Sequence, residues 1–259
     1  MSLQTLFATD VAAAVFHGAQ AVAVGVLFAT TQKDKGTFSL TQRVYDRERW
    51  RVDGKYLKWL VVAFPTLSMT NHIVSAVRYK QLGVRALSDN YVNSYRWLEY
   101  GASAAIMFWI IAQLSGVTDV PLLVMVALMN FALQFCGYMI ERTGDDDYAF
   151  SVIGWLVFVA IWIPIVWKFF DSLSVASSSL DDDGETTLDV PGVIYAIVFV
   201  QVALFAAFGA ASFYFRKRRA RRDIVKREVT YATLSLVAKS LLTWLIVGGA
   251  LNAGVGNAD

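Results

Sequence analysis

Lys239 lies near the middle of residues 229–251, an apolar stretch long enough to cross a lipid bilayer. An ammonium group at the midpoint of a membrane-spanning helix costs about 2.5–3.5 kcal/mol on insertion scales. Desolvation favours the neutral amine, which is a nucleophile, so a buried lysine is suited to forming a Schiff base with a carbonyl compound. The position of Lys239 therefore indicates covalent chemistry rather than a contribution to stability.

Three further ionisable residues, His17, His72 and Glu99, are predicted to lie inside apolar segments. Counted from the segment ends, these residues and Lys239 are about 6 to 10 residues deep, or roughly 9–15 Å at 1.5 Å per residue. We therefore expect them to share one layer. Glu99 is the only acid that we expect deep enough to pair with Lys239, because an opposite charge within about 4–6 Å offsets desolvation.

Hydroxyl and amide side chains share helix faces with these ionisable groups. Residues three or four apart lie on the same face of a helix. This spacing relates Ser235 to Lys239, Ser68 to His72, and Gln20 to His17. The pattern predicts a polar cavity able to hold ordered water. For the histidines, the alternative is that they only join helices through interhelical hydrogen bonds.

The elements that must position these residues are seven apolar segments. Hydrophobic residues make up 56% of the 259-residue sequence and charged residues only 17%, a balance typical of a polytopic membrane protein. Each segment has the twenty or so residues that span about 30 Å of hydrocarbon. We predict a single all-α domain over residues 1–259, with spans at residues 7–31, 56–77, 93–116, 120–140, 148–170, 192–215 and 229–251.

The distribution of basic residues predicts the orientation of the chain. Residues 216–228 are rich in arginine and are expected to form a basic cytoplasmic loop by the positive-inside rule. The N-terminus is then cytoplasmic and the C-terminus extracellular, and residues 32–55 form a long extracellular loop. Alternation within residues 43–54 is compatible with a short β-hairpin there. A nucleic-acid role for the basic run is the alternative, but a membrane anchor explains it better, and no nucleic-acid partner is expected.

The sequence lacks patterns typical of several other functions. It contains one cysteine, Cys136, which excludes an intramolecular disulfide. It has no glycine-rich phosphate loop, no Cys/His metal spacing and no nucleophile elbow. We expect neither an enzyme nor a metal site.

Local motifs resemble those of the heliorhodopsins over essentially the whole chain. The most specific are Ser235-Leu-Val-Ala-Lys239-Ser240 in the last span and Arg96-Trp97-Leu98-Glu99-Tyr100 in the third. Other matching positions are Val15-Phe16-His17 with Gln20, Ser68 with His72, Asn130, Gly137 and Glu141, and Val190-Pro191-Gly192 with Tyr195. Ordinary microbial rhodopsins usually carry aspartates at the positions of Ser235 and Glu99.

The resemblance implies a retinal-binding photoreceptor that spans the cell membrane with its N-terminus in the cytoplasm. All-trans retinal would be bound covalently to Lys239 as a protonated Schiff base, with Glu99 as its counterion. His17, His72, Ser68 and Gln20 would line the polar cavity. The remaining positions expected near the chromophore are Ser235, Tyr100, Trp162, Asn130, Met107 and Tyr195. The family also implies a homodimer in membrane lipid.

The leading functional hypothesis is a light sensor that signals by conformational change without pumping ions, with an unidentified cytoplasmic partner. The expected deep ionisable groups all lie in the inner half of the membrane, whereas a pump needs a donor and an acceptor on opposite sides. One alternative is a light-gated proton channel. Another is a transporter that uses Lys239 and Glu99 as a substrate-binding ion pair without a chromophore.

Overall fold

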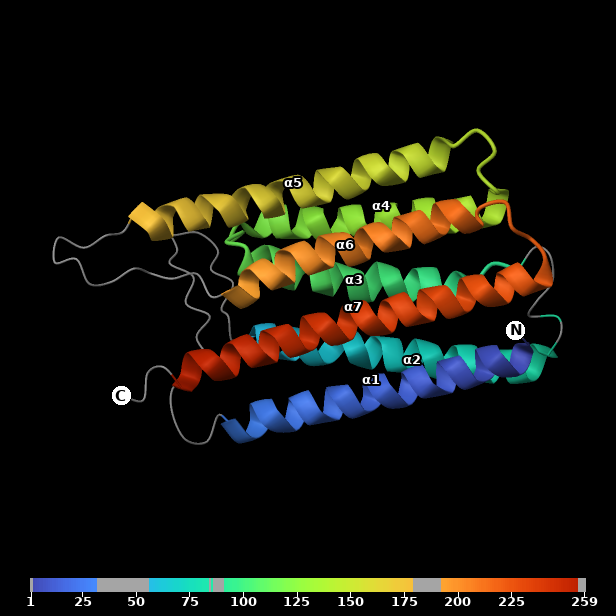
Figure 1. Cartoon of the computed structure of the whole chain (residues 1–259), viewed down its shortest axis with the longest axis horizontal. Helices are drawn as coiled ribbons and strands as arrows, with labels where there is room; N and C mark the ends of the chain where they lie inside the picture. Colours follow the sequence, from blue (N-terminus) through green and yellow to red (C-terminus); the bar gives the residue numbers. More distant parts are fainter. Residues whose placement is uncertain (1, 32–55, 84, 86–90, 179–191, 256–259) are drawn as a thin grey trace.

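A computed structural model describes residues 2–31, 56–83, 85, 91–178 and 192–255. Its described residues form seven helices and no strand, as predicted (Figure 1). The helices are α1 (Leu3–Thr31), α2 (Leu57–Leu82), α3 (Ser94–Leu114), α4 (Val120–Thr143), α5 (Ala149–Ser178), α6 (Gly192–Phe215) and α7 (Arg221–Val255). Each is long and apolar enough to cross a membrane, and the chain is an integral membrane protein. The expected loop and hairpin within residues 32–55 lie outside the described residues.

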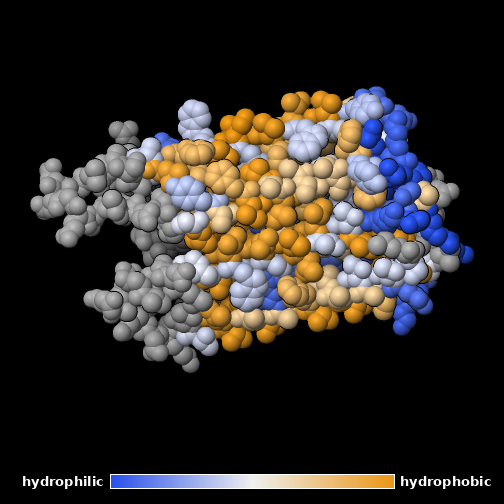
Figure 2. All heavy atoms as spheres, viewed as in Figure 1, coloured by the Kyte–Doolittle hydropathy of each residue, from blue (hydrophilic) through white to orange (hydrophobic). Residues whose placement is uncertain are grey.

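The helices pack as a ring in chain order, with α7 closing the ring against α1. They run alternately up and down, so that α1, α3, α5 and α7 run in one direction (Figure 1). We call the end of the bundle that holds the start of α1 the N-terminal face, and the opposite end the C-terminal face. Strongly hydrophilic side chains gather at the N-terminal face, and apolar side chains cover most of the middle of the bundle on the face shown (Figure 2).

Local sequence signals define helix ends near the functional residues. The Asn93 side chain accepts a hydrogen bond from the Arg96 amide and caps α3. Asp119 caps α4 in the same way through the Leu122 amide at 2.8 Å, and Pro121 follows in the first turn of that helix. Such caps satisfy amides that have no partner inside the helix. Gly144 ends α4 with a φ of 86°, a conformation that favours glycine.

The connection between α6 and α7 is shorter than predicted. We expected a basic loop over residues 216–228, but α7 begins at Arg221, so that the connection is only residues 216–220. The charged residues Arg227 and Glu228 were read as loop, yet both are buried in ion pairs and continue the helix. Within the connection, a hydrogen bond from Lys217 to the exposed side chain of Asp146, at 2.9 Å, lowers the pKa of that carboxyl.

Candidate functional site

Lys239 and Glu99 form a buried ion pair. The Lys239 Nζ donates to Glu99 Oε1 at 2.6 Å, and the two residues are 3% and 9% exposed. The buried Ser68 hydroxyl donates to the same carboxylate oxygen at 2.7 Å and accepts a hydrogen bond from Lys239. The predicted pairing of Lys239 with Glu99 is confirmed. Three helices, α2, α3 and α7, therefore meet at one charge pair.

The two histidines lie against each other beside this pair. Their rings are stacked, with centroids 5.7 Å apart and an angle of 13° between the planes. His72 Nδ1 lies 2.6 Å from Asp10 Oδ1, whereas both ring nitrogens of His17 are buried without a hydrogen-bond partner. A second buried acid, Asp10, lies here, and the sequence analysis did not include it among the ionisable residues of this layer. Asp10 of α1 is buried because His72 covers it. Its position only a few residues into the predicted span gave no sign of this contact.

Three further polar residues, Gln20, Tyr100 and Ser235, are buried near Lys239. Gln20 Oε1 accepts from the Ser240 hydroxyl at 3.3 Å. The Tyr100 ring lies 5.2 Å from Lys239 Nζ, and its hydroxyl donates to the backbone oxygen of Tyr231 at 3.0 Å. The Ser235 hydroxyl is buried and has no hydrogen-bond partner. These groups place a polar environment on the α1, α3 and α7 side of the lysine.

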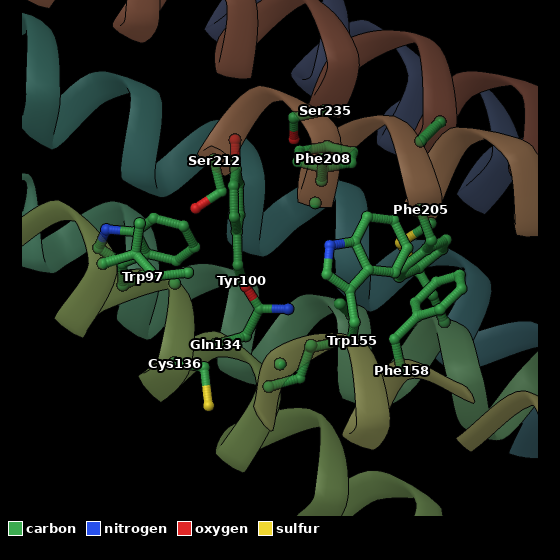
Figure 3. Close-up of a pocket in the computed structure, with 18 of the residues that line it drawn as sticks. Trp97, Tyr100, Gln134, Cys136, Trp155, Phe158, Phe205, Phe208, Ser212 and Ser235 are labelled. Carbon is green, nitrogen blue, oxygen red and sulfur yellow. The ribbon is translucent and has the colours of Figure 1, made fainter. Parts of the chain in front are cut away.

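A largely apolar cavity of about 90 Å³ lies next to Lys239. Lys239, Ser235 and Ala238 form part of its wall. Aromatic rings of Trp155, Phe158, Phe205 and Phe208 enclose the cavity from α5 and α6, and Tyr100 faces it from α3 (Figure 3). The site thus joins an amine with a buried carboxylate partner to a largely apolar, aromatic cavity.

A second set of buried charges lies nearer the N-terminal face. Arg96 pairs with Glu228 at 2.5 Å and also with Glu141, while Arg227 pairs with Glu141 at 2.5 Å and with Glu228 at 3.3 Å. We call these four residues the ion ring. Trp97 Nε1 adds a hydrogen bond to Glu141 at 2.5 Å. The ring joins α3, α4 and α7, and the sequence analysis did not anticipate it as a site.

The C-terminal side of the lysine has a different character. There most of the described core consists of apolar residues that are almost fully buried: Val24, Phe28, Val61, Phe64, Phe108, Ile110, Ile111, Leu242 and Ile246. The buried polar residues on this side, Gln113, Ser115 and Thr243, are not ionisable. The region around Lys239 therefore has buried polar groups toward the N-terminal face and a mainly apolar core toward the C-terminal face.

Comparison with known proteins identifies the family. The sequence profile of the heliorhodopsins matches residues 6–251. The chain belongs to the heliorhodopsin family. No curated protein matches this heliorhodopsin in sequence.

Solved structures share its fold at low sequence identity. The cyanorhodopsin of the cyanobacterium Tolypothrix sp. NIES-4075 is 14% identical, with a TM-score of 0.59 over 94% of this chain and 90% of that one. The transmembrane domain of the Salpingoeca rosetta rhodopsin phosphodiesterase is 16% identical, with a TM-score of 0.53 over 96% and 88%. At such identities the likeness establishes the rhodopsin fold alone.

Membership of the family makes this heliorhodopsin a retinal-binding, light-responsive rhodopsin, and its residues fit that chromophore. Retinal is an apolar aldehyde, and the cavity next to Lys239 offers an amine beside an apolar, aromatic wall. Gly209 belongs to that wall, where a Cβ would lie 3.0 Å from the Trp155 ring. A side chain at that point would require the Trp155 ring to shift by a few tenths of an ångström.

The other residues predicted near the chromophore lie at different distances from the cavity of this heliorhodopsin. Met107 lines it, and Trp162 packs against Phe108 and Phe205 with its indole nitrogen unpartnered. Asn130 is one layer back, where its side chain donates to the backbone oxygen of Gly101 at 2.9 Å. Tyr195 lies away from the cavity, because it packs against Phe169 and is 39% exposed.

The sequence gives only weak evidence for the buried charges of the ion ring. Arg96 belongs to the motif that drew attention to Glu99, and Glu141 directly follows the predicted fourth span. Both lie within a few residues of a predicted helix end, where charged side chains usually reach the membrane surface. Only the packed bundle shows that they turn inward instead.

Proposed function

We propose that this heliorhodopsin is a light sensor in which all-trans retinal is attached to Lys239 as a protonated Schiff base. The observation that carries the proposal is the buried contact between Lys239 and Glu99 at the wall of an aromatic cavity. A carboxylate at this distance stabilises a positive charge on the lysine nitrogen, which would otherwise be very costly inside the membrane. Glu99 therefore serves as the counterion.

The chain's own residues then divide the work. When bound, the chromophore supplies visible-light absorption and a change of shape by isomerisation. Glu99 and Ser68 hold the proton on the lysine nitrogen before illumination, since both contact Nζ. Aromatic side chains of α5 and α6 line the cavity and would surround the bound chromophore there. Motion of these rings would bias the packing of α5, α6 and α7 toward a second arrangement.

The distribution of protonatable groups supports signalling rather than pumping. In the described residues, Asp10, His72 and the ion ring lie between Lys239 and the N-terminal face. On the other side, Phe64, Phe108 and Leu242 belong to a closed apolar core. A pump needs an acceptor and a donor on opposite sides of the lysine. Among the described residues, the buried ionisable groups near Lys239 lie on one side only.

The proposal extends to orientation and partners. The N-terminal face carries the basic residues around the start of α7, so that it faces the cytoplasm by the positive-inside rule. The protein would form a homodimer in the lipid bilayer. A cytoplasmic signalling partner would read the arrangement of α6 and α7 at the basic N-terminal face.

The first test is a visible absorption spectrum after expression with all-trans retinal. The unaltered protein should show a visible band, and Lys239→Ala should lack it. Lys168→Ala removes a half-exposed lysine paired with Asp171, and this matched control should keep the band. Glu99→Gln should keep a visible band at low pH. As the pH is raised, this band should disappear at a lower pH than in the unaltered protein, because the neutral amide no longer stabilises the cation. A Lys239→Ala variant that retains the visible band would disprove the attachment site.

Light-gated proton conduction is the second candidate function. Polar groups run from Lys239 through His72 and Asp10 toward the ion ring, which favours proton movement within the half near the N-terminal face. Photocurrents in voltage-clamped cells separate the two functions. We expect no steady photocurrent, because the apolar core blocks the other half; a steady current that reverses with the proton gradient would favour the channel.

A further inference from the structure

Asp10 is a buried carboxylate that the proposed photochemistry does not yet use. It is 6% exposed, and its Oδ1 lies 2.6 Å from Nδ1 of His72, which is 5% exposed. With Asp10 ionised, its carboxylate only accepts hydrogen bonds, and the proton of this contact then lies on Nδ1. The second ring nitrogen of a neutral His72, Nε2, then carries the lone pair.

The surroundings of Asp10 include other charged groups. A small polar cavity of about 10 Å³, roughly the room for one water molecule, is lined by Asp10, His72, Tyr79, Arg96 and Glu228, together with neighbouring polar residues. His72 is the direct hydrogen-bond partner of Asp10, and the charges of Arg96 and Glu228 act on Asp10 from further away with opposite signs. The carboxylate therefore faces α2, α3 and α7 at once, with His72 as its direct partner.

His17 lacks a comparable partner. Its ring stacks on His72, but neither of its nitrogens has a hydrogen-bond partner. No described carboxylate is paired with it. A cationic His17 would therefore be less stable than a cationic His72, whose charge Asp10 offsets at 2.6 Å. The two histidines differ in hydrogen bonding because Asp10 contacts His72 and not His17.

We propose that Asp10 is a positioning residue that prepares His72 to accept the proton released from the lysine nitrogen after illumination. In this step, which rests on the proposed function, the N–H bond at Lys239 breaks and its electron pair stays on that nitrogen. The lone pair of His72 Nε2 forms the new N–H bond. The product is an imidazolium–carboxylate pair between α2 and α1, so the proton remains inside the protein. A carboxylate fixes the tautomer of a general-base histidine in the same way in hydrolase triads.

The tautomer is tested in the dark by nitrogen NMR. The chain contains two histidines, so histidine-selective ¹⁵N labelling gives two imidazoles, and His17→Asn assigns them. We expect Nδ1 of His72 to be protonated and strongly hydrogen-bonded, and Asp10→Asn to abolish this signature. The measurement does not depend on photochemistry. An unchanged His72 spectrum in Asp10→Asn would overturn the proposal.

Flash spectroscopy tests the functional consequence in the retinal-bound protein. Loss of a hydrogen bond to a charged group changes an equilibrium by roughly tenfold or more, so Asp10→Asn should reduce the near-ultraviolet absorption that reports deprotonation of the lysine nitrogen by about that factor. In a His72→Asn background, Asp10→Asn should have no further effect, since the two residues act as a unit. Asp171→Asn, at the surface beside Lys168, serves as the control and should match the unaltered protein.

The outcomes separate this inference from the proposed function. If Lys239→Ala retains the visible band, the proposed function fails. Two results would contradict the role of Asp10 while the visible band behaves as expected. In the first, Asp10→Asn changes the transient near-ultraviolet absorption by less than twofold. In the second, Asp10→Asn still changes this absorption in the His72→Asn background. If Asp10→Asn does not fold, Asp10→Glu decides, because it keeps the carboxylate: a near-normal transient supports the role, and one lowered by about tenfold contradicts it.

Discussion

The Lys239 amine shows how neighbouring side chains make a costly residue tolerable in a membrane. Its charge is offset by Glu99 at 2.6 Å and by the Ser68 hydroxyl. The same principle recurs nearer the N-terminal face, where each carboxylate of the ion ring contacts two guanidinium groups. Buried ions of this kind are tolerated because every charge has a partner, and removing one partner leaves another unpaired.

Arg96 is the most sensitive member of the ion ring. Arg96→Met removes the guanidinium that contacts both Glu141 and Glu228. Breaking a buried pair in this way costs about 3–5 kcal/mol, so we expect a marked loss of thermal stability, measured as heat-induced loss of the visible band. Arg218→Met, at the exposed connection beside Tyr214, should change stability little. Equal melting temperatures for both variants would contradict the structural role of the ring.

At the scale of elements, close approach between α3 and α4 fixes the wall of the cavity. The Asn130 side chain of α4 binds the backbone of α3. Gly137 on α4 lies directly against the Trp97 ring of α3, leaving no room for a Cβ. Because Trp97 also donates to Glu141, this packing connects the cavity to the ion ring. The α3–α4 contact is therefore a structural determinant of both sites.

Gly137→Ala tests this contact. The added methyl group overlaps the Trp97 ring and should cost about 1–3 kcal/mol through overpacking, with a shift of the visible band because Trp97 also lines the cavity. Gly25→Ala is the matched control, since a Cβ at Gly25 meets nothing within 4 Å. The control should be neutral or stabilised by up to about 1 kcal/mol, as expected for glycine to alanine in a helix. The proposed packing would be refuted by equal stability of the two variants.

For the whole molecule, polarity differs between the two halves of the bundle. In the described residues, hydrophilic side chains gather on the surface at the N-terminal face (Figure 2). The buried ions lie toward the same face, while the described core toward the C-terminal face is mainly apolar. This asymmetry supports both the proposed orientation and the retention of the proton in one half. It also places the basic residues beside the half in which charge would move.

The proposed orientation predicts a cytoplasmic N-terminus and an external C-terminus. A fluorescent protein that matures only in the cytoplasm should remain dark when fused to the C-terminus in a bacterial inner membrane. The same protein fused to the N-terminus should fluoresce. Bright fluorescence from the C-terminal fusion, with a normal visible band, would reverse the proposed topology.

The sequence by itself determined the seven helices and the pairing of Lys239 with Glu99. A spanning segment must satisfy its own backbone hydrogen bonds in lipid, so its length and apolarity suffice to define it. A lysine in the middle of such a segment requires an acid at its own depth. Both inferences depend only on how far each residue lies from the ends of its own helix.

Tertiary structure alone decided which charges near the helix ends turn inward. Asp10, Arg96 and Glu228 each lie where a side chain could reach the membrane surface, and their burial depends on partners from other helices. Because Glu228 and Arg227 are paired inside the bundle, α7 includes them and begins at Arg221. Helix rotation likewise placed Met107 in the cavity and Tyr195 against Phe169. These features follow from packing between helices, which spacing within a helix does not specify.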